Sequence, residues 1–153
     1  TKSMSLGVNG LTEVPSEIQT FKNIEHLDLE ANKLTDLPTF LGNFENLVSL
    51  NARFNKFKKI PSNISKLKNL EVLNLEGNPA IDHLSEDIYE LTSLKDLNME
   101  YNPIKEISPS IGKLKNLRVL NLSNGESIER LPETVGNLKN LEILNVGVNK
   151  IKD

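Results

Sequence analysis

The chain has 153 residues, which suits one domain, and its 18 basic and 21 acidic side chains give a formal net charge of -3. No basic excess is therefore present to neutralise phosphates, so we expect no nucleic-acid partner. The chain has no run of about 20 apolar residues that would span a bilayer and no signal-peptide core, and its lack of cysteine excludes disulfides and favours a cytoplasmic compartment.

A unit of 23 or 24 residues repeats along the whole chain. The units begin at Thr1, Ile24, Leu47, Leu70, Leu94, Leu117 and Leu141. The fourth and sixth are one residue longer than the others, in segments that we place in return loops. Six units are complete and the seventh stops at Asp153. We therefore expect one repeat domain over residues 1–153, and because it begins and stops within the pattern, we expect it to be part of a longer chain.

Each unit opens with the pattern of a short strand. Position 4 of the unit is apolar throughout, at Met4, Leu27, Leu50, Leu73, Leu97, Leu120 and Leu144. Position 6 is also apolar, at Leu6, Leu29, Ala52, Leu75, Met99, Leu122 and Val146. Strand side chains alternate between two faces, so these positions point inward and positions 3, 5, 7 and 8 point outward. Where Ala52 leaves space in the core, we expect the ring of Phe57 to fill it.

A turn and a short helical segment follow each strand. Position 9 is asparagine in six units, at Asn9, Asn32, Asn55, Asn78, Asn102 and Asn149. A buried amide at this position can bond to backbone groups that lose their ladder where the chain turns. Two apolar residues three positions apart, such as Ile18 and Phe21, then predict one or two helical turns. We expect irregular structure where Ser85 and Ser108 replace the proline of other units and where Gly125 replaces the asparagine.

The recurring pattern L-x-x-L-x-L-x-x-N-x-L-x-x-L-P-x-x-I-x-x-L resembles the leucine-rich repeat family over the entire chain. Its 23-residue version is similar to that of intracellular scaffold and Ras-pathway proteins and of bacterial leucine-rich proteins. The resemblance implies an α/β solenoid, a right-handed superhelix with a concave parallel sheet and short helices or 3-10 turns on the convex side. One unit buries too little apolar surface to offset the entropy of ordering its residues, so the units must stack.

The sequence gives little support for catalysis. No H-E-x-x-H, Walker A, G-x-G-x-x-G or G-x-S-x-G motif occurs, and the only histidines are His26 and His83. His26 lies two residues from Asp28, which allows either a histidine-carboxylate contact or a solvated polar pair. We therefore expect no enzyme activity, no metal site and no cofactor.

The outward positions near the end of each strand carry the most informative side chains. Position 7 reads Gly7, Glu30, Arg53, Glu76, Glu100, Ser123 and Gly147, and position 8 reads Val8, Ala31, Phe54, Gly77, Tyr101, Asn124 and Val148. On strands about 4.8 Å apart, Phe54 and Tyr101 would flank a notch above Gly77, roughly 10 Å across. Arg53 can pair with the glutamates on both neighbouring strands. Glu100 is then left as a carboxylate that a cation from a partner would neutralise.

Two more outward columns and the convex side complete the candidate surfaces. Position 5 holds Asp28 and a run of five asparagines, which predicts a solvated amide ladder. Position 3 holds His26 and Asp96 and becomes apolar toward the C-terminus, for partner contact or for strand stability. On the convex side we place Phe40 and Tyr89 as outward aromatics, and a set of lysines that either forms a basic stripe or keeps the solenoid in solution.

We therefore expect a protein-protein interaction module that binds a partner protein or peptide on its concave face, as a scaffold, regulatory or recognition domain. The partner segment is expected to be basic or amphipathic. The predicted contact residues are His26, Asp28, Glu30, Arg53, Phe54, Glu76, Gly77, Asp96, Glu100 and Tyr101. Two alternatives remain open: a structural spacer that stacks with copies of itself, and the substrate-recognition part of a larger enzyme or receptor. The sequence does not fix the oligomeric state.

Overall fold

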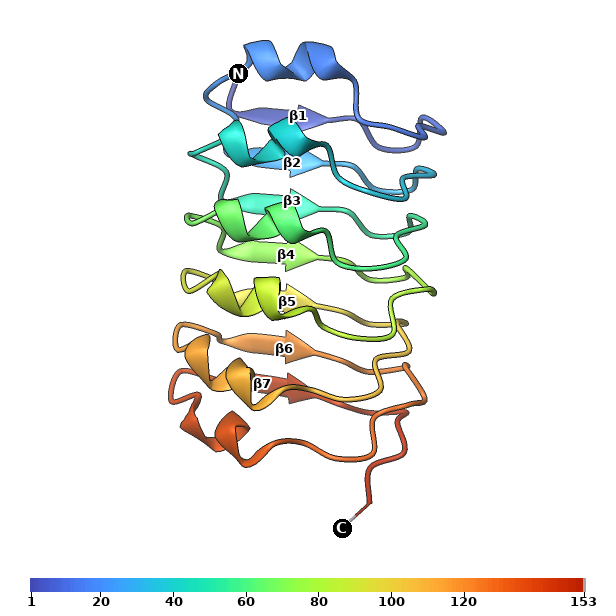
Figure 1. Cartoon of the computed structure of the whole chain (residues 1–153), viewed down its shortest axis with the longest axis vertical. Coiled ribbons are helices and arrows are strands. Elements are labelled where there is room, and N and C mark those ends of the chain that lie inside the picture. The colour runs from blue at the N-terminus through green and yellow to red at the C-terminus, as the bar shows by residue number, and fades with distance from the viewer. Residues whose placement is uncertain (153) are drawn as a thin grey trace.

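A parallel sheet of seven strands lines one face of the computed structural model, which describes residues 1–152 (Figure 1). The strands lie side by side in chain order: β1 (Ser3–Ser5), β2 (His26–Asp28), β3 (Ser49–Asn51), β4 (Val72–Asn74), β5 (Asp96–Asn98), β6 (Val119–Asn121) and β7 (Ile143–Asn145). Their register advances by one repeat, so that Leu50 pairs with Leu27 on one side and with Leu73 on the other. Each column of the sequence repeat is therefore a column of stacked residues.

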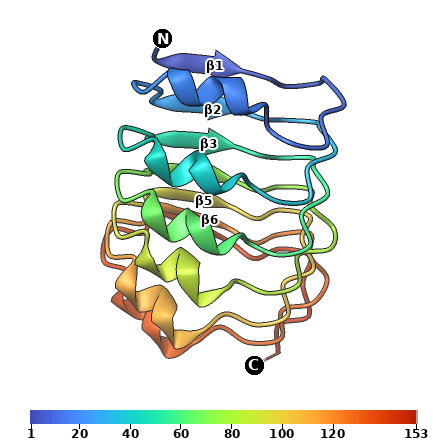
Figure 2. The same cartoon turned by 45° about the horizontal axis from the view of Figure 1, so that its top comes forward.

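Short 3-10 helices form the opposite, convex face of the solenoid (Figures 1 and 2). They are η1 (Ser16–Thr20), η2 (Thr39–Asn43), η3 (Ser62–Lys66), η4 (Glu86–Glu90), η5 (Pro109–Lys113) and η6 (Glu133–Asn137). Each ends where the backbone N–H of the following residue bonds to a carbonyl three residues back, as Phe21 does to Ile18 at 3.0 Å. The predicted solenoid with a concave parallel sheet and convex 3-10 turns is confirmed.

The hydrophobic core runs the length of the solenoid between the sheet and the 3-10 helices. Position 4 is buried in every coil except the first and the last, where Met4 is partly buried and Leu144 is exposed. Ala52 and Phe57 are both fully buried. As predicted, the aromatic ring lies inside the core of the coil whose strand carries the small residue.

The asparagines of position 9 join each coil to the next, as the sequence predicts. Asn78 is fully buried. Its amide nitrogen donates to the carbonyl of Ala52 in the preceding coil at 3.2 Å and to that of Leu75 in its own coil at 2.9 Å. Its side-chain oxygen accepts the backbone N–H of Phe57 at 3.2 Å. The side chain therefore replaces the strand ladder where the backbone turns away from the sheet.

The irregularity predicted at Ser85 and Ser108 is absent. These serines have φ and ψ of -65° and 152° and of -62° and 145°, close to the -67° and 149° of Pro38 in the second coil. The coil thus requires an extended backbone, which serine adopts without strain. Gly125 does change its surroundings: a Cβ there would collide with the carbonyl of Asn102. Because Gly125 has no side-chain amide that could accept a hydrogen bond, the N–H of Asn102 bonds to a carbonyl of its own coil, that of Met99, at 3.3 Å.

The longer fourth and sixth coils keep the sheet in register. Val72 pairs with Asp96 and Val119 pairs with Ile143, at the same strand positions that pair in the shorter coils. The extra residue is therefore accommodated outside the strands, as predicted.

One convex aromatic was assigned wrongly from the sequence. Tyr89 on η4 is fully buried, not outward, because its ring packs into the core beneath the next coil. Phe40 on η2 is partly buried, and its ring lies edge-on to that of Phe44 with centroids 6.2 Å apart. Neither ring supplies the second exposed aromatic surface that the repeat pattern suggested.

Candidate functional site

A tight turn follows six of the seven strands. The side chain at position 5 accepts a hydrogen bond from the backbone N–H at position 7, as Asp28 does from Glu30 at 3.0 Å and Asn98 does from Glu100 at 2.9 Å. Asparagine and aspartate commonly stabilise turns in this way. The asparagine column is thus explained by the turn that presents the position 7 side chains.

The residue at position 8 has a left-handed backbone in every coil. The φ angles are 57° at Val8, 55° at Ala31, 54° at Phe54, 67° at Gly77, 60° at Tyr101, 58° at Asn124 and 52° at Val148. This conformation is disfavoured for residues other than glycine and asparagine. Phe54 and Tyr101 nevertheless occupy it, with 42% and 54% of their surface exposed. The turn therefore holds two aromatic side chains at the surface beside the concave sheet.

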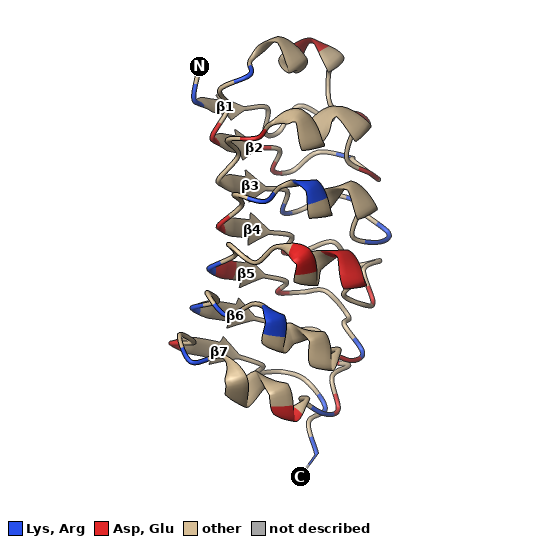
Figure 3. Ribbon diagram, turned by 60° about the vertical axis from the view of Figure 1, so that its left-hand side comes forward, with Lys and Arg blue, Asp and Glu red and all other residues tan. Residues whose placement is uncertain are grey.

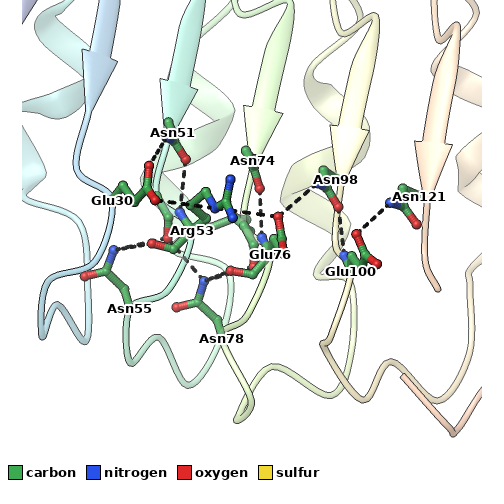
Figure 4. Close-up of polar contacts among 12 residues, drawn as sticks. Glu30, Asn51, Arg53, Asn55, Asn74, Glu76, Asn78, Asn98, Glu100 and Asn121 are labelled. Atoms are coloured by element: carbon green, nitrogen blue, oxygen red, sulfur yellow. Dashed lines mark hydrogen bonds and ion pairs between the residues drawn. The ribbon is translucent and has the colours of Figure 1, made fainter. Parts of the chain in front are cut away.

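Arg53 lies between two carboxylates, as predicted (Figure 4). Its Nε is 3.7 Å from Glu30 Oε1 and 3.6 Å from Glu76 Oε2, on the coils before and after its own. The guanidinium carbon also lies 4.5 Å from the centroid of the Phe54 ring, a cation–π contact. The arginine is therefore held on three sides, with its charge balanced within the chain.

Glu100 has no ion-pair partner among residues 1–152, but it has hydrogen-bond partners that the sequence interpretation did not foresee. Its carboxylate accepts hydrogen bonds from the side-chain amides of Asn121 at 3.2 Å and Asn124 at 2.8 Å. Asn98 likewise donates to Glu76 at 3.5 Å, and Asn51 donates to Asp28 at 3.1 Å. The predicted amide ladder is therefore a ladder in which amides bind carboxylates of the preceding coil (Figure 4). A carboxylate accepts more strongly than another amide does, which explains this pairing.

The notch predicted above Gly77 is filled. The ring of Phe54 leans over the neighbouring strand, so that a Cβ at Gly77 would collide with ring atoms Cδ1 and Cε1. The Phe54 ring thus packs directly against Gly77, where any side chain would collide with it. The left-handed φ of 67° at this residue also suits glycine. The sequence shows which columns are adjacent but not the direction in which a side chain leans.

The other predicted residues lie on the same face but do not form a compact cluster. His26 is exposed, while Asp28 bonds to Ser5 at 3.0 Å and to Asn51. Of the two alternatives that the sequence allowed, the histidine-carboxylate contact is therefore absent among residues 1–152. His26 and Asp28 line a shallow groove of about 330 Å³ over β1 to β3. Asp96 lies farther along, between two valines of its column.

A row of ion pairs at position 2 of the repeat was not predicted from the sequence. Lys2 pairs with Glu25 at 3.5 Å, Lys95 with Glu71 at 3.0 Å and Arg118 with Glu142 at 3.0 Å. The signal was present in the repeat, since each pair has opposite charges one unit apart. The hydrogen bond between Arg118 and Glu142 lowers the pKa of the Glu142 carboxyl and raises the pKa of Arg118.

The concave surface as a whole is acidic. The outward columns 3, 5 and 7 contain five carboxylates and one lysine or arginine, Arg53. The carboxylates are Asp28, Glu30, Glu76, Asp96 and Glu100. Residues 1–152 contain no group of three or more histidine, cysteine or acidic side chains arranged to hold a metal ion. They also contain no helix long and apolar enough to cross a bilayer.

Comparison with known proteins identifies the family. The leucine-rich repeat region family matches residues 2–101 and 72–152, which together span nearly the whole chain. The chain belongs to the leucine-rich repeat family. Repeats of this family typically form interaction scaffolds and not enzymes. A search of curated proteins finds no match.

Solved leucine-rich repeat structures superpose on the whole solenoid. An internalin of Listeria monocytogenes shares 28% identity with a TM-score of 0.81, over 99% of this chain and 43% of its own. A leucine-rich repeat protein of Leptospira interrogans shares 27% identity with a TM-score of 0.75, over 99% of this chain and 50% of its own.

A plant receptor provides a third likeness. The Arabidopsis receptor kinase HAESA, in complex with the peptide hormone IDA and a co-receptor, shares 27% identity with a TM-score of 0.81. The match covers 95% of this chain and 26% of the receptor chain. The leucine-rich repeats described here thus span half or less of the length of these three structures.

Proposed function

We propose that this chain is a protein-interaction module whose concave face binds an extended segment of a partner that carries both basic and apolar side chains. The observation that carries the proposal is the ordered carboxylate of Glu100 beside two exposed aromatic rings, Phe54 and Tyr101, in the turns that follow β3 and β5. The structural likeness to a receptor in complex with a peptide hormone supports this class of function.

The Glu100 carboxylate is suited to bind a cation because it is already oriented. Glu100 is fixed by the side-chain amides of Asn121 and Asn124 and forms no ion pair in residues 1–152, whereas Glu76 is buried and lies 3.6 Å from Arg53. A lysine or arginine side chain of a partner can therefore pair with Glu100. Amide partners leave the negative charge of a carboxylate intact, whereas an internal cation would cancel it. The face therefore keeps an acidic surface that loses little further entropy on binding.

The aromatic rings supply apolar contact area next to these charges. Phe54 and Tyr101 occupy left-handed positions where glycine or asparagine fits with less strain. Aromatic and arginine side chains are also the residues most enriched at binding hot spots, and Arg53 lies against Phe54. These three side chains form the centre of the proposed contact.

The test compares two double variants at the same backbone position. A partner captured from native extract is purified, and its affinity is measured for the Phe54→Ala/Tyr101→Ala variant and for the control Val8→Ala/Val148→Ala. The control removes exposed apolar side chains from left-handed turns in the first and last coils. We expect the first variant to weaken binding by at least about 1–2 kcal/mol, the second to change it little, and both to melt close to the parent.

A charge variant tests the acidic half of the proposal. The replacement Glu100→Gln should weaken the same complex and reduce its dependence on ionic strength, because screening acts on charged contacts. Unchanged affinity in both the aromatic and the glutamine variants would place the partner on another surface. A spacer that stacks with its own copies would show no such partner and would grow in mass with concentration in light scattering.

A further inference from the structure

The convex face contains a groove between η5 and η6. It has a volume of about 810 Å³ and is lined by residues of both helices and of the loops that follow them. Gly112 lies in its wall, where an added Cβ would be 3.2 Å from Thr134 Cβ and 3.8 Å from Asn137 Nδ2. The groove thus lies where two helices approach closely at a residue without a side chain.

At two other helices the space that corresponds to the one above Gly112 is filled. Between η2 and η3, the space above Gly42 is filled by the side chain of Lys66. Tyr89 occupies the corresponding position of η4 and is fully buried. At Gly112 only the short side chain of Thr134 and the Asn137 amide come near. The convex surface is thus open at the fifth and sixth coils, and a second opening, which is lined by Glu13, Glu17 and Asp36 and by no lysine, lies at the first and second coils.

The groove is basic and its charges are unpaired. Lys113, Lys115 and Lys139 line it, and no acidic residue does. None of the three ammonium groups lies within 4.0 Å of a carboxylate in residues 1–152. Lys139 bonds only to a backbone carbonyl, that of Gly136, at 3.2 Å. This contrasts with the concave face, where the cation Arg53 lies between two carboxylates.

The positive area is small and sharply bounded. The adjacent helix η4 carries Glu86, Asp87 and Glu90, and Figure 3 shows this acidic helix between the lysines of η3 and η5. The lysines of the convex face thus do not form the continuous stripe that the sequence allowed. A flat anionic bilayer or a nucleic-acid duplex would bring its phosphates against η4 as well as against the groove. A narrow anionic chain avoids this repulsion.

We propose that the groove between η5 and η6 binds an acidic peptide segment of a partner protein, with its carboxylates at Lys113, Lys115 and Lys139. Charge complementarity selects the occupant, and the side-chain amides of the groove wall add hydrogen-bond donors. This site is separate from the concave face and prefers the opposite charge. One molecule can therefore hold a basic segment on one side and an acidic segment on the other.

The experiment uses a fluorescein-labelled peptide in which glutamate alternates with serine, titrated with the chain at low ionic strength and followed by anisotropy. One variant reverses the groove charges (Lys113→Glu, Lys115→Glu, Lys139→Glu). A control reverses three exposed lysines elsewhere on the chain (Lys58→Glu, Lys59→Glu, Lys68→Glu), which line no pocket and form no ion pair in residues 1–152. Both variants change the net charge equally, and thermal melting verifies that both are folded.

We expect saturable binding of the glutamate peptide, at least tenfold weaker in the groove variant and less than threefold weaker in the control. The same peptide with glutamine in place of glutamate should not bind. Equal losses in the two variants would assign the binding to net charge and overturn the proposal. So would the absence of saturable binding, or tighter binding of phosphatidylserine vesicles or duplex DNA than of the peptide.

Discussion

Tyr89 shows how one side chain can depart from the pattern of its column. The corresponding position of η2, η3, η5 and η6 holds a small residue, as at Gly42, Ser65 and Gly112. The Tyr89 side chain is the largest of those that are fully buried, and its hydroxyl lies near the backbone of Ser108 without a hydrogen bond to any residue from 1 to 152. Burial without a partner leaves the lost hydration of a hydroxyl uncompensated.

Replacing Tyr89 with phenylalanine is therefore expected to stabilise the chain. The variant keeps the buried ring and removes the unpaired hydroxyl, so its free energy of unfolding at pH 7 should rise by about 1 kcal/mol. Urea titration followed by circular dichroism measures the difference. Replacement with alanine serves as the control and should lower stability by about 3–5 kcal/mol, because it leaves a cavity.

The same residue should make the stability of the chain sensitive to alkali. Burial raises the pKa of Tyr89 to about 12 from its ordinary value of 10.0. The folded state then holds this proton more tightly than the unfolded state, so its contribution is complete below pH 10 and is lost as the pH rises toward 12. The advantage of the phenylalanine variant should therefore widen between pH 10 and 12. A constant advantage over this range would contradict the raised pKa.

At the scale of one coil, the position 9 asparagine replaces the hydrogen bonds that the strand no longer provides. Replacing Asn78 with alanine leaves the buried N–H of Phe57 without its partner and removes one of the two amide donors to the carbonyl of Ala52, the other being Asn55. We expect a loss of about 2–4 kcal/mol in the free energy of unfolding. The control is Asn9→Ala, because Asn9 is exposed and its amide donates only within its own coil, as to Leu6 at 3.0 Å. Similar losses in the two variants would show that burial of the amide is not decisive.

The elements of the coil were predictable because they depend on spacing. The strands, the 3-10 turns and the buried Asn78 follow from the positions of apolar and amide residues in the repeat. The contact of Arg53 with Glu30 and Glu76 follows from register alone, since a column of the repeat becomes a column in space. Ser85 shows the limit of such spacing, because the coil requires the extended backbone of proline and not proline itself.

The details of the candidate surface depend on side-chain direction, which spacing does not determine. Phe54 leans over Gly77 and fills the notch that the columns suggested. Glu100 is satisfied by Asn121 and Asn124, which lie one coil farther along the chain. Both results reflect choices among rotamers at positions whose backbone was placed correctly. A candidate binding surface can therefore be located from a repeat, but its shape requires coordinates.

At the scale of the whole molecule, the core is a stack in which each coil covers its neighbours. Leu97 in the middle of the stack is fully buried, whereas Leu144 in the last coil is 37% exposed at the same repeat position. The stability of such a solenoid is approximately a sum over coils and their interfaces. The cost of truncating a leucine should therefore depend on its place in the stack.

Alanine replacements at these two positions test this dependence. We expect Leu97→Ala to lower the free energy of unfolding by about 2–5 kcal/mol, because it opens a cavity between two covered coils. Leu144→Ala should cost less than about 1.5 kcal/mol, because less of its side chain is removed from water. Thermal and urea unfolding of both variants provide the measurement. Equal costs would mean that the final coil is covered in solution.

The extra residue of the fourth and sixth coils shows what determines the pitch of the molecule. Asp96 still pairs with Val72 and Ile143 with Val119, as their counterparts do in shorter coils. The rise from coil to coil is thus fixed by the sheet and the asparagine turns, while the return loop adjusts only the circumference. A coil can therefore gain residues without a change in its spacing from the neighbouring coils. The return loops can therefore differ in length from coil to coil while the spacing of the outward columns on the concave face stays constant.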